Sequence, residues 1–279
     1  NPFDPPEEYL HRYTERLSEV PLPNYVEGEL DNKPHHQKIL HESSLNVNPE
    51  NIKTILPAKM SDDDHRYVKA AYWAMCDLID AQVGRLVDYL KRIGEYDNTI
   101  IIFMSDHGEM LGDHGLYYKA INMYEAAVHV PFIIHYPAKL KPRRYKNTIE
   151  AMRIAPTILE AAGLPDDPGM QCKSIWQQLV NAEEIEGEDV YCEYYNALKE
   201  TRVPSTDCFA TMIRDKDYKL MVYHGSNEGE LYDLKNDPNE TINLFDNSKY
   251  TDKKTDMLIR LCNKMAWTVD PLPIREGTF

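Results

Sequence analysis

The sequence lacks both a long apolar run and an excess of basic residues. No stretch approaches the roughly 18 to 20 consecutive apolar residues of a transmembrane helix, so we expect no membrane partner. Lysine and arginine total 31 against 46 aspartate and glutamate residues, a formal net charge of −15. Because such a chain repels nucleic-acid phosphates and anionic surfaces, we expect no nucleic-acid partner either. A soluble globular protein fits this composition.

Cysteine pairs are also absent. The five cysteines are scattered along the chain, and none forms a C-x-x-C pair. This pattern argues against a zinc knuckle and against a disulfide scaffold. It leaves the cellular compartment open.

The first residues contain neither a start methionine nor the apolar core of a signal peptide. Residues 1–6 read NPFDPP, which is polar and rich in proline. We therefore expect the chain to begin inside a longer polypeptide. Export would then depend on a signal peptide upstream of residue 1.

The segment from residue 61 to about 170 has an α/β pattern. Ser61 is a good helix N-cap, apolar residues recur at steps of three and four from Tyr72 to Leu90, and Gly94 is a stop signal. We expect this helix to pack its apolar face on a core. Residues 99–104 and 130–136 are apolar and β-branched, which predicts strands buried on both faces in a parallel sheet, and residues 149–162 predict a helix.

The rest of the chain predicts a smaller antiparallel sheet. Short strands are expected at residues 189–195, 209–214, 218–223 and 230–234, followed by a helix at residues 251–267. We divide the chain into an α/β core at residues 1–170 and a C-terminal subdomain at residues 171–279. The expected fold class is α/β, with a sheet flanked by helices plus a small antiparallel sheet covered by a helix.

The residues with the most chemical information follow the first expected strand. Asp106, His107 and Gly108 lie where ligands bind in open α/β sheets, at the carboxyl end of a strand. Asp106 and His107 together could be two ligands of one divalent metal. These residues fit a polar turn with a capping aspartate equally well. Lys119, twelve residues after His107, could place a point charge on an anionic group, although alone it is typical of a surface lysine.

The order of several motifs resembles the sulfatase family. Residues 105–116 read SDHGEMLGDHGL, residues 119–125 read KAINMYE, and residues 230–244 read ELYDLKNDPNETINL. The resemblance spans roughly residues 61 to 245. It implies an alkaline-phosphatase-like core and hydrolysis of sulfate monoesters, such as aryl or sugar sulfates.

The resemblance also implies roles for individual residues. Asp106 and His107 would be metal ligands, and Lys119 would contact the sulfate as a catalytic and substrate-binding residue. His114, in the same motif, would be a second substrate-binding residue. The metal would be Ca²⁺, with Mn²⁺ or Zn²⁺ as alternatives.

The chain departs from the family pattern in one respect. It contains no C-x-P-x-R or S-x-P-x-R motif, where the family carries a nucleophile that is converted to formylglycine. We therefore expect a truncated chain that is inactive alone, with formylglycine in the missing N-terminal part. A phosphomonoester, phosphodiester or phosphonate hydrolase of the same fold, or a non-catalytic remnant of it, stays open as an alternative.

Overall fold

The computed structural model describes residues 3–43, 45–46, 54–119, 121–195 and 209–268. The chain forms two compact units. The first comprises the described residues up to Ala138 together with Asn239–Asn243. The second comprises Lys139–Tyr195, Phe209–Pro238 and the described residues from Leu244 on. The domain boundary expected at residue 170 stays a prediction.

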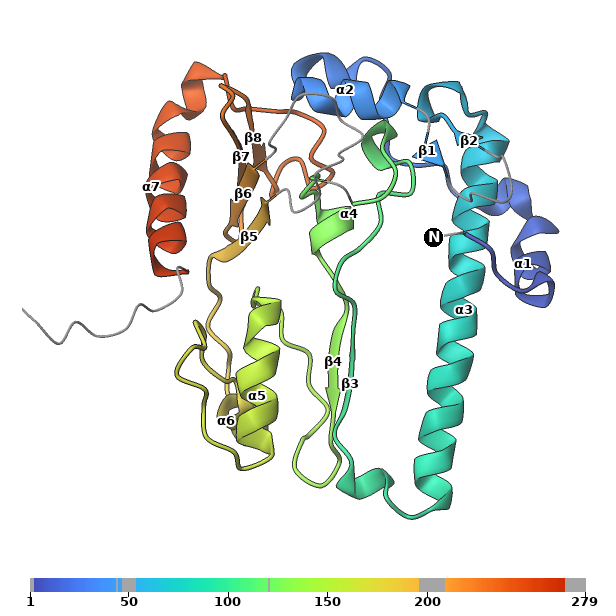
Figure 1. The fold of residues 1–279 in the computed structure, drawn as a ribbon, viewed down its shortest axis with the longest axis vertical. Helices are drawn as coiled ribbons and strands as arrows, with labels where there is room; N and C mark the ends of the chain where they lie inside the picture. Colours follow the sequence, from blue (N-terminus) through green and yellow to red (C-terminus); the bar gives the residue numbers. More distant parts are fainter. Residues whose placement is uncertain (1–2, 44, 47–53, 120, 196–208, 269–279) are drawn as a thin grey trace, which may run out of the picture. The chain divides into compact units, whose positions relative to one another are not determined.

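The first unit is mainly helical, with two short β-ribbons (Figure 1). Its helices are α1 (Glu7–Thr14), α2 (His35–Glu42), α3 (Asp62–Arg92) and α4 (Glu125–Val128). Its strands are β1 (Leu45–Asn46), β2 (Thr54–Ile55), β3 (Ile101–Met104) and β4 (Phe132–His135).

Helix α3 begins and ends where its sequence predicts. The Ser61 hydroxyl accepts a hydrogen bond from the Asp64 backbone N–H at 3.2 Å, and the Asp64 carboxylate accepts one from the Ser61 N–H at 2.9 Å. This reciprocal capping box satisfies two N–H groups at the helix start. The helix ends at Arg92, just before Gly94, which takes a positive φ of 77°.

The expectation that the apolar face of α3 packs on a core is wrong over much of the helix. Its buried residues lie near its N-terminal end, at Lys69, Ala70, Ala71 and Ala74. Further along, Ile79 is 52% exposed and Leu86 is 66% exposed. A helical repeat of apolar residues shows which face of the helix gains free energy from burial, but it does not determine whether another element covers that face.

Among the helices that the structure describes, none has the length and apolar character needed to cross a membrane.

Strand β3 confirms one part of the prediction for residues 99–104 and corrects another. The strand forms at Ile101–Met104, but it pairs antiparallel with β4, with Ile101 opposite His135 and Met104 opposite Phe132. In the described part of the chain β3 pairs with β4 alone. Phe103 is 36% exposed and Ile133 is 58% exposed, so the strands are not buried on both faces. A continuous apolar run indicates a strand without fixing the direction or number of its neighbours.

The second unit contains the small antiparallel sheet that the sequence predicts. Its order is β5-β6-β7-β8, with bounds β5 (Val190–Tyr195), β6 (Phe209–Arg214), β7 (Tyr218–His224) and β8 (Gly229–Asp233). The turn between β6 and β7 is closed by Asp215, whose carboxylate accepts the N–H groups of Asp217 at 2.9 Å and Tyr218 at 2.7 Å. Helices α5 (Ile154–Ala161) and α6 (Trp176–Asn181) precede the sheet in the chain.

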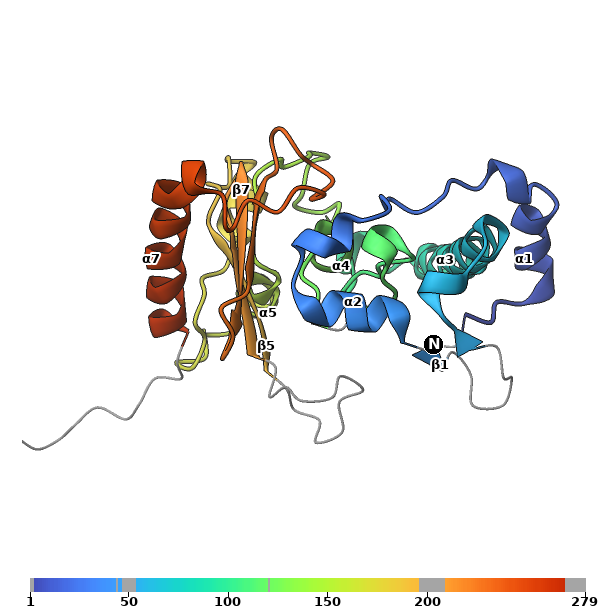
Figure 2. The same cartoon turned by 90° about the horizontal axis from the view of Figure 1, so that it is seen from above.

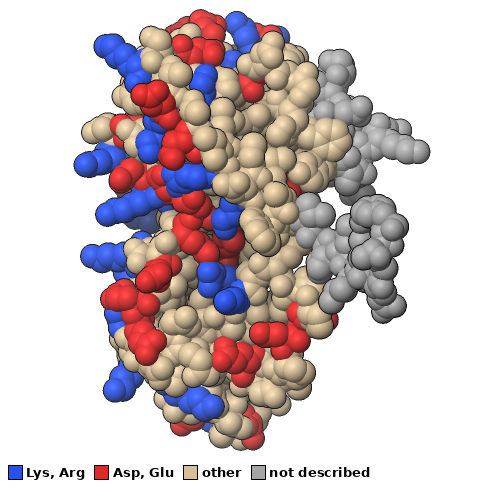
Figure 3. Space-filling view, turned by 90° about the vertical axis from the view of Figure 1, so that its left-hand side faces the viewer, with Lys and Arg blue, Asp and Glu red and all other residues tan. Residues whose placement is uncertain are grey.

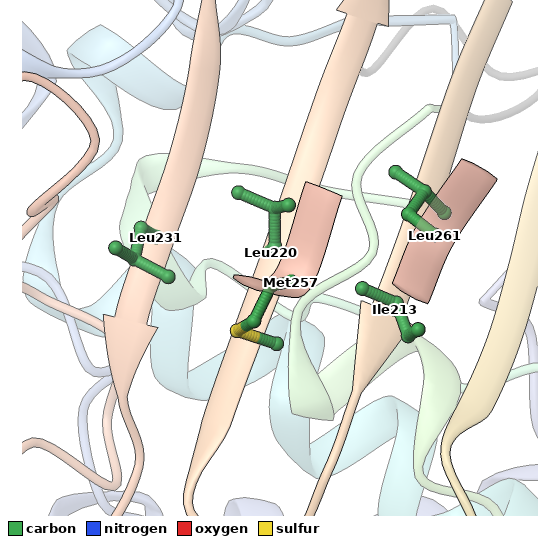
Figure 4. Close-up of a cluster of buried hydrophobic side chains, with 5 residues drawn as sticks. All are labelled: Ile213, Leu220, Leu231, Met257 and Leu261. Atoms are coloured by element: carbon green, nitrogen blue, oxygen red, sulfur yellow. The ribbon is translucent and has the colours of Figure 1, made fainter. Parts of the chain in front are cut away.

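Helix α7 (Thr251–Trp267) covers one face of this sheet (Figure 2). Figure 4 shows the contact, in which Met257 and Leu261 from the helix meet Ile213, Leu220 and Leu231 from the strands. All five side chains are at most 2% exposed. The periods of 3.6 in the helix and 2 in the strands place these residues on facing surfaces.

Charged residues of both signs are interspersed on the molecular face shown in Figure 3. Lysine and arginine side chains there lie next to aspartate and glutamate side chains. In the second unit, Arg260 of α7 forms ion pairs with Asp189, Asp215 and Asp256.

Candidate active site

Asp106 and His107 lie directly after strand β3, as predicted. The His107 backbone N–H donates to the Asp106 carboxylate at 3.0 Å, and the Asp106 side chain is 83% exposed. The slight burial of Asp106 raises its pKa. The nearby His107, the backbone N–H hydrogen bonds and the Lys119 charge lower it, and their combined effect is larger, so the pKa of Asp106 is lowered. Asp106 is therefore an accessible anionic oxygen donor.

His107 presents one ring nitrogen for ligation. Its Nδ1 lies 2.7 Å from the Gly108 carbonyl oxygen. Because a carbonyl only accepts, Nδ1 must carry the proton, which leaves the Nε2 lone pair available. Nε2 lies 3.6 Å from the Asp106 carboxylate. The two side chains thus place an oxygen and a nitrogen donor next to each other.

Gly108 allows the strand-end segment to approach α4 closely. A Cβ at this position would lie 2.0 Å from the Ala126 carbonyl oxygen, which is closer than any side chain tolerates. The Gly108 N–H donates to the Ala127 carbonyl at 2.8 Å, and the Glu109 N–H donates to the Ala126 carbonyl at 3.1 Å. Glycine is needed here for close contact with the backbone of Ala126.

Lys119 is exposed, and its charge contributes to the lowered pKa of Asp106. Lys119 is therefore near enough for its charge to act on Asp106. Its carbonyl accepts the N–H of Asn122 at 2.9 Å. An exposed ammonium near a strand-end carboxylate can bind an anion only where other cations offset that carboxylate.

His114 lies in a buried cluster. It is 3% exposed and its ring stacks on Tyr124, with 4.0 Å between ring centroids. Its Nδ1 lies 2.9 Å from the Glu29 carboxylate and 3.1 Å from the Lys33 ammonium, which itself lies 3.5 Å from the same carboxylate. The predicted role of His114 in substrate binding stays a prediction, and in this structure its Nδ1 is engaged with Glu29.

Sequence reasoning missed the residues that hold this cluster together. Lys33 donates to the Glu240 carbonyl at 2.8 Å and lies over the Tyr124 ring, 4.6 Å from its centroid. The Glu240 carboxylate accepts the Glu125 N–H at 2.7 Å. Glu240 falls within residues 230–244, a motif that did stand out, but nothing near Lys33 in the sequence indicated a role. Lys33 contacts His114 and Glu240, which lie 81 and 207 positions away in the sequence, so no local sequence pattern predicts these contacts.

The chain matches two family models along most of its length. The model described as "Sulfatase" covers residues 12–164. A second, described as "N-sulphoglucosamine sulphohydrolase, C-terminal", covers residues 112–266. This chain belongs to the sulfatase family. Asp106, His107 and Lys119 all lie within the first match.

Individual relatives agree with this assignment. The sulfatase chain is 35% identical, over 67% of its length, to an N-acetylglucosamine-6-O-sulfatase of Bacteroides thetaiotaomicron. It is 30% identical, with a TM-score of 0.65 over 77% of its length, to the solved structure of a protein in complex with its substrate D-glucosamine-2-N,6-O-disulfate. A phosphonate monoester hydrolase of Agrobacterium radiobacter shares the fold, with a TM-score of 0.83 over 97% of this chain and 24% identity.

The sulfatase chain spans only part of each relative. It covers 34% of the N-acetylglucosamine-6-O-sulfatase, 43% of the disulfate complex and 55% of the phosphonate monoester hydrolase. The two family-model matches together include the Asp106–Lys119 segment and the antiparallel sheet of the second unit.

The donor set of this sulfatase chain suits a divalent metal but is incomplete. Asp106 offers a hard oxygen and His107 a nitrogen, which together suit Ca²⁺, Mn²⁺ or Zn²⁺. Within the described residues, no cluster of three or more histidine, cysteine, aspartate or glutamate side chains is arranged to hold a metal ion. Asp106 and His107 therefore suit two of the ligand positions of a metal site that needs further ligands.

Proposed function

We propose that this chain is part of a sulfuric ester hydrolase that cleaves sulfate monoesters. The observation that carries the proposal is family membership together with the geometry at the end of β3. There, Asp106 and His107 lie side by side, and the Lys119 charge acts on Asp106.

Each residue has a proposed part in the reaction. A sulfate monoester carries one negative charge, and attack at sulfur increases the charge on its oxygens and on the leaving oxygen. The Lys119 ammonium binds a sulfate oxygen and stabilises the charge that develops there. Asp106 and His107 Nε2 would hold a divalent metal, which supplies further charge stabilisation when bound.

The metal we propose is Ca²⁺, with Mn²⁺ and Zn²⁺ as alternatives. Calcium takes six to eight oxygen ligands, so Asp106 and His107 would need partners from outside this chain. We propose that a preceding segment supplies these ligands and the formylglycine nucleophile. The sequence has no C-x-P-x-R or S-x-P-x-R motif of its own.

Two observations support a longer protein. The chain spans about a third to just over half of each of the three relatives. Ile79 and Leu86 on α3, with Phe103 and Ile133 on the β3–β4 ribbon, are apolar and exposed. Exposed apolar faces of this kind gain free energy when a further part of the fold covers them.

A sugar sulfate is the substrate we propose. One relative at 35% identity is an N-acetylglucosamine-6-O-sulfatase, and a structural relative at 30% identity binds D-glucosamine-2-N,6-O-disulfate. The phosphonate monoester hydrolase is 24% identical, so its likeness concerns the fold and does not favour phosphonate chemistry.

Hydrolysis assays test the proposal. We expect the 279-residue chain alone to release no product from nitrocatechol sulfate above a blank. A longer protein with the upstream nucleophile should hydrolyse it, or hydrolyse a 6-O-sulfated glucosamine. Turnover by the isolated chain would contradict the truncation. Hydrolysis of a phosphonate monoester but of no sulfate ester by the longer protein would contradict the sulfatase assignment.

A further inference from the structure

Glu109 connects two parts of the site that are separated in the sequence. It lies two residues after His107 and nine before Tyr118. Its Oε1 accepts the Tyr118 backbone N–H at 2.5 Å and the Leu111 backbone N–H at 3.3 Å. One carboxylate oxygen therefore joins the segment of the candidate metal ligands to the residue just before Lys119.

The two N–H donors belong to residues in unfavourable backbone conformations. Leu111 has a φ of 48° and Tyr118 a φ of 63°. This left-handed region is unfavourable for a residue with a side chain, and such conformations persist only where other contacts hold them. Hydrogen bonds to a carboxylate are stronger than those to a neutral acceptor, so Glu109 is suited to hold both turns.

The backbone of the same short segment is fixed on its other side. The N–H groups of Gly108 and Glu109 donate to the carbonyls of Ala127 and Ala126, at the α4 helix that follows Lys119 in the chain. The Lys119 loop is thus anchored on both sides to the residues that follow His107. The carboxylate of Glu109 supplies the anchor nearer to Lys119.

We propose that Glu109 is the positioning residue for Lys119. This inference rests on the proposed function, in which Lys119 contacts the sulfate. Glu109 acts through Tyr118: its carboxylate holds the Tyr118 N–H, and this sets where the next residue projects relative to Asp106 and His107. Glu109 itself is engaged with backbone and does not contact the substrate.

Amide hydrogen exchange in the 279-residue chain tests the contact without any need for activity. We expect the Tyr118 amide to be protected in the wild type and to exchange at least about 10-fold faster in Glu109→Ala, because its acceptor is gone. Glu109→Gln keeps an acceptor oxygen and should exchange more nearly like the wild type. Amides of the β6–β7 pair serve as an internal reference. Should Glu109→Ala fail to fold, Glu109→Asp, whose carboxylate is one methylene shorter, should show faster exchange at Tyr118 in a folded chain.

A Tyr118 amide that is unprotected in the wild type would overturn the proposal. Equal Tyr118 exchange in the wild type and Glu109→Ala would overturn it too, as would equal exchange in the wild type and Glu109→Asp if only the latter folds.

A double-mutant cycle in the longer protein separates positioning from a general structural effect. Lys119→Ala should lower kcat/KM by about 10²- to 10³-fold and Glu109→Ala by about 10-fold or more. If Glu109 acts through Lys119, the double variant should lie within about 3-fold of Lys119→Ala alone. Losses that multiply would overturn the positioning role. The exposed Glu95→Ala variant is the control and should retain wild-type activity.

The amide-exchange measurement and the kinetic measurement test different claims, so one can fail without the other. If the wild-type longer protein hydrolyses no sulfate ester, the proposed function is wrong. The exchange rates of the Tyr118 amide still decide whether Glu109 holds the Lys119 loop.

Discussion

Lys119 is the residue on which the proposed sulfate contact depends. In the longer protein, Lys119→Ala should lower kcat/KM for a sulfate ester by about 10²- to 10³-fold, because a fixed charge aimed at a developing anion contributes about 2–4 kcal/mol. Lys119→Arg should restore only part of this, since a planar guanidinium does not reproduce a compact ammonium.

Lys139→Ala and Lys141→Ala are the matched controls for Lys119. Both lysines are exposed, and both variants should stay near wild-type kcat/KM. The unfolding midpoint of Lys119→Ala should also be unchanged, because the side chain is exposed. Near-normal kcat/KM in Lys119→Ala would reduce the candidate site to Asp106 and His107.

Glu29 should make the stability of the first unit depend on pH. Its side chain is 3% exposed, and burial alone would raise its pKa. The hydrogen bond from His114, the Lys33 charge and the Val26 N–H outweigh burial and lower the pKa below the ordinary 4.5. A lowered carboxyl pKa contributes stability that is present above the unfolded pKa and is lost as the pH falls through the folded value.

Chemical denaturation of Glu29→Gln at several pH values measures this contribution. The free energy of unfolding of the wild type should fall between about pH 5 and pH 3. The fall should be shallower in Glu29→Gln, because the variant has no carboxyl group there. The exposed Glu8→Gln variant should follow the wild type. Identical pH profiles for Glu29→Gln and wild type would show that the cluster does not hold Glu29 ionised.

At the scale of single elements, the buried side chains of Met257 and Leu261 hold α7 against the sheet. Met257→Ala should lower the free energy of unfolding of the second unit by about 2–5 kcal/mol, because it leaves a cavity between helix and sheet. Ile259→Ala, on the same helix but at a residue 58% exposed, should change it by less than about 0.5 kcal/mol. Thermal unfolding followed by circular dichroism measures both, and equal effects would contradict the packing of α7 on the sheet.

The elements differ in how far their sequences predicted them. Helix α7 matches its predicted bounds, and α3 has the predicted cap, because local propensities and capping groups lie within a few residues of each other. Helix α2 and the short α4 were not predicted. Helix α4 has four residues, and its first N–H bonds to Glu240, a partner 115 positions away.

At the scale of the whole molecule, the candidate metal site should bind weakly in this chain. We expect calorimetry to give a Ca²⁺ affinity for the 279-residue chain far below that of the longer protein, because Asp106 and His107 fall short of six ligands. Asp106→Asn should abolish Ca²⁺ binding in the longer protein. If the isolated chain binds Ca²⁺ tightly and Asp106→Asn abolishes that binding, the chain itself holds further Ca²⁺ ligands.

By itself, the sequence predicted the strand before Asp106 and His107, because an apolar run is a local feature. The order of its motifs, through their resemblance to the sulfatase family, singled out Asp106, His107 and Lys119 as candidate site residues. Tertiary structure alone decided the antiparallel pairing of β3 with β4, the burial of His114 against Glu29, and the contact of Glu109 with Tyr118. Asn239–Asn243 also joins the first unit although it follows strand β8 of the second. These outcomes depend on which distant segments meet and which buried charges then find partners, and hydrogen bonds across 9 to 207 positions leave no trace in local periodicity.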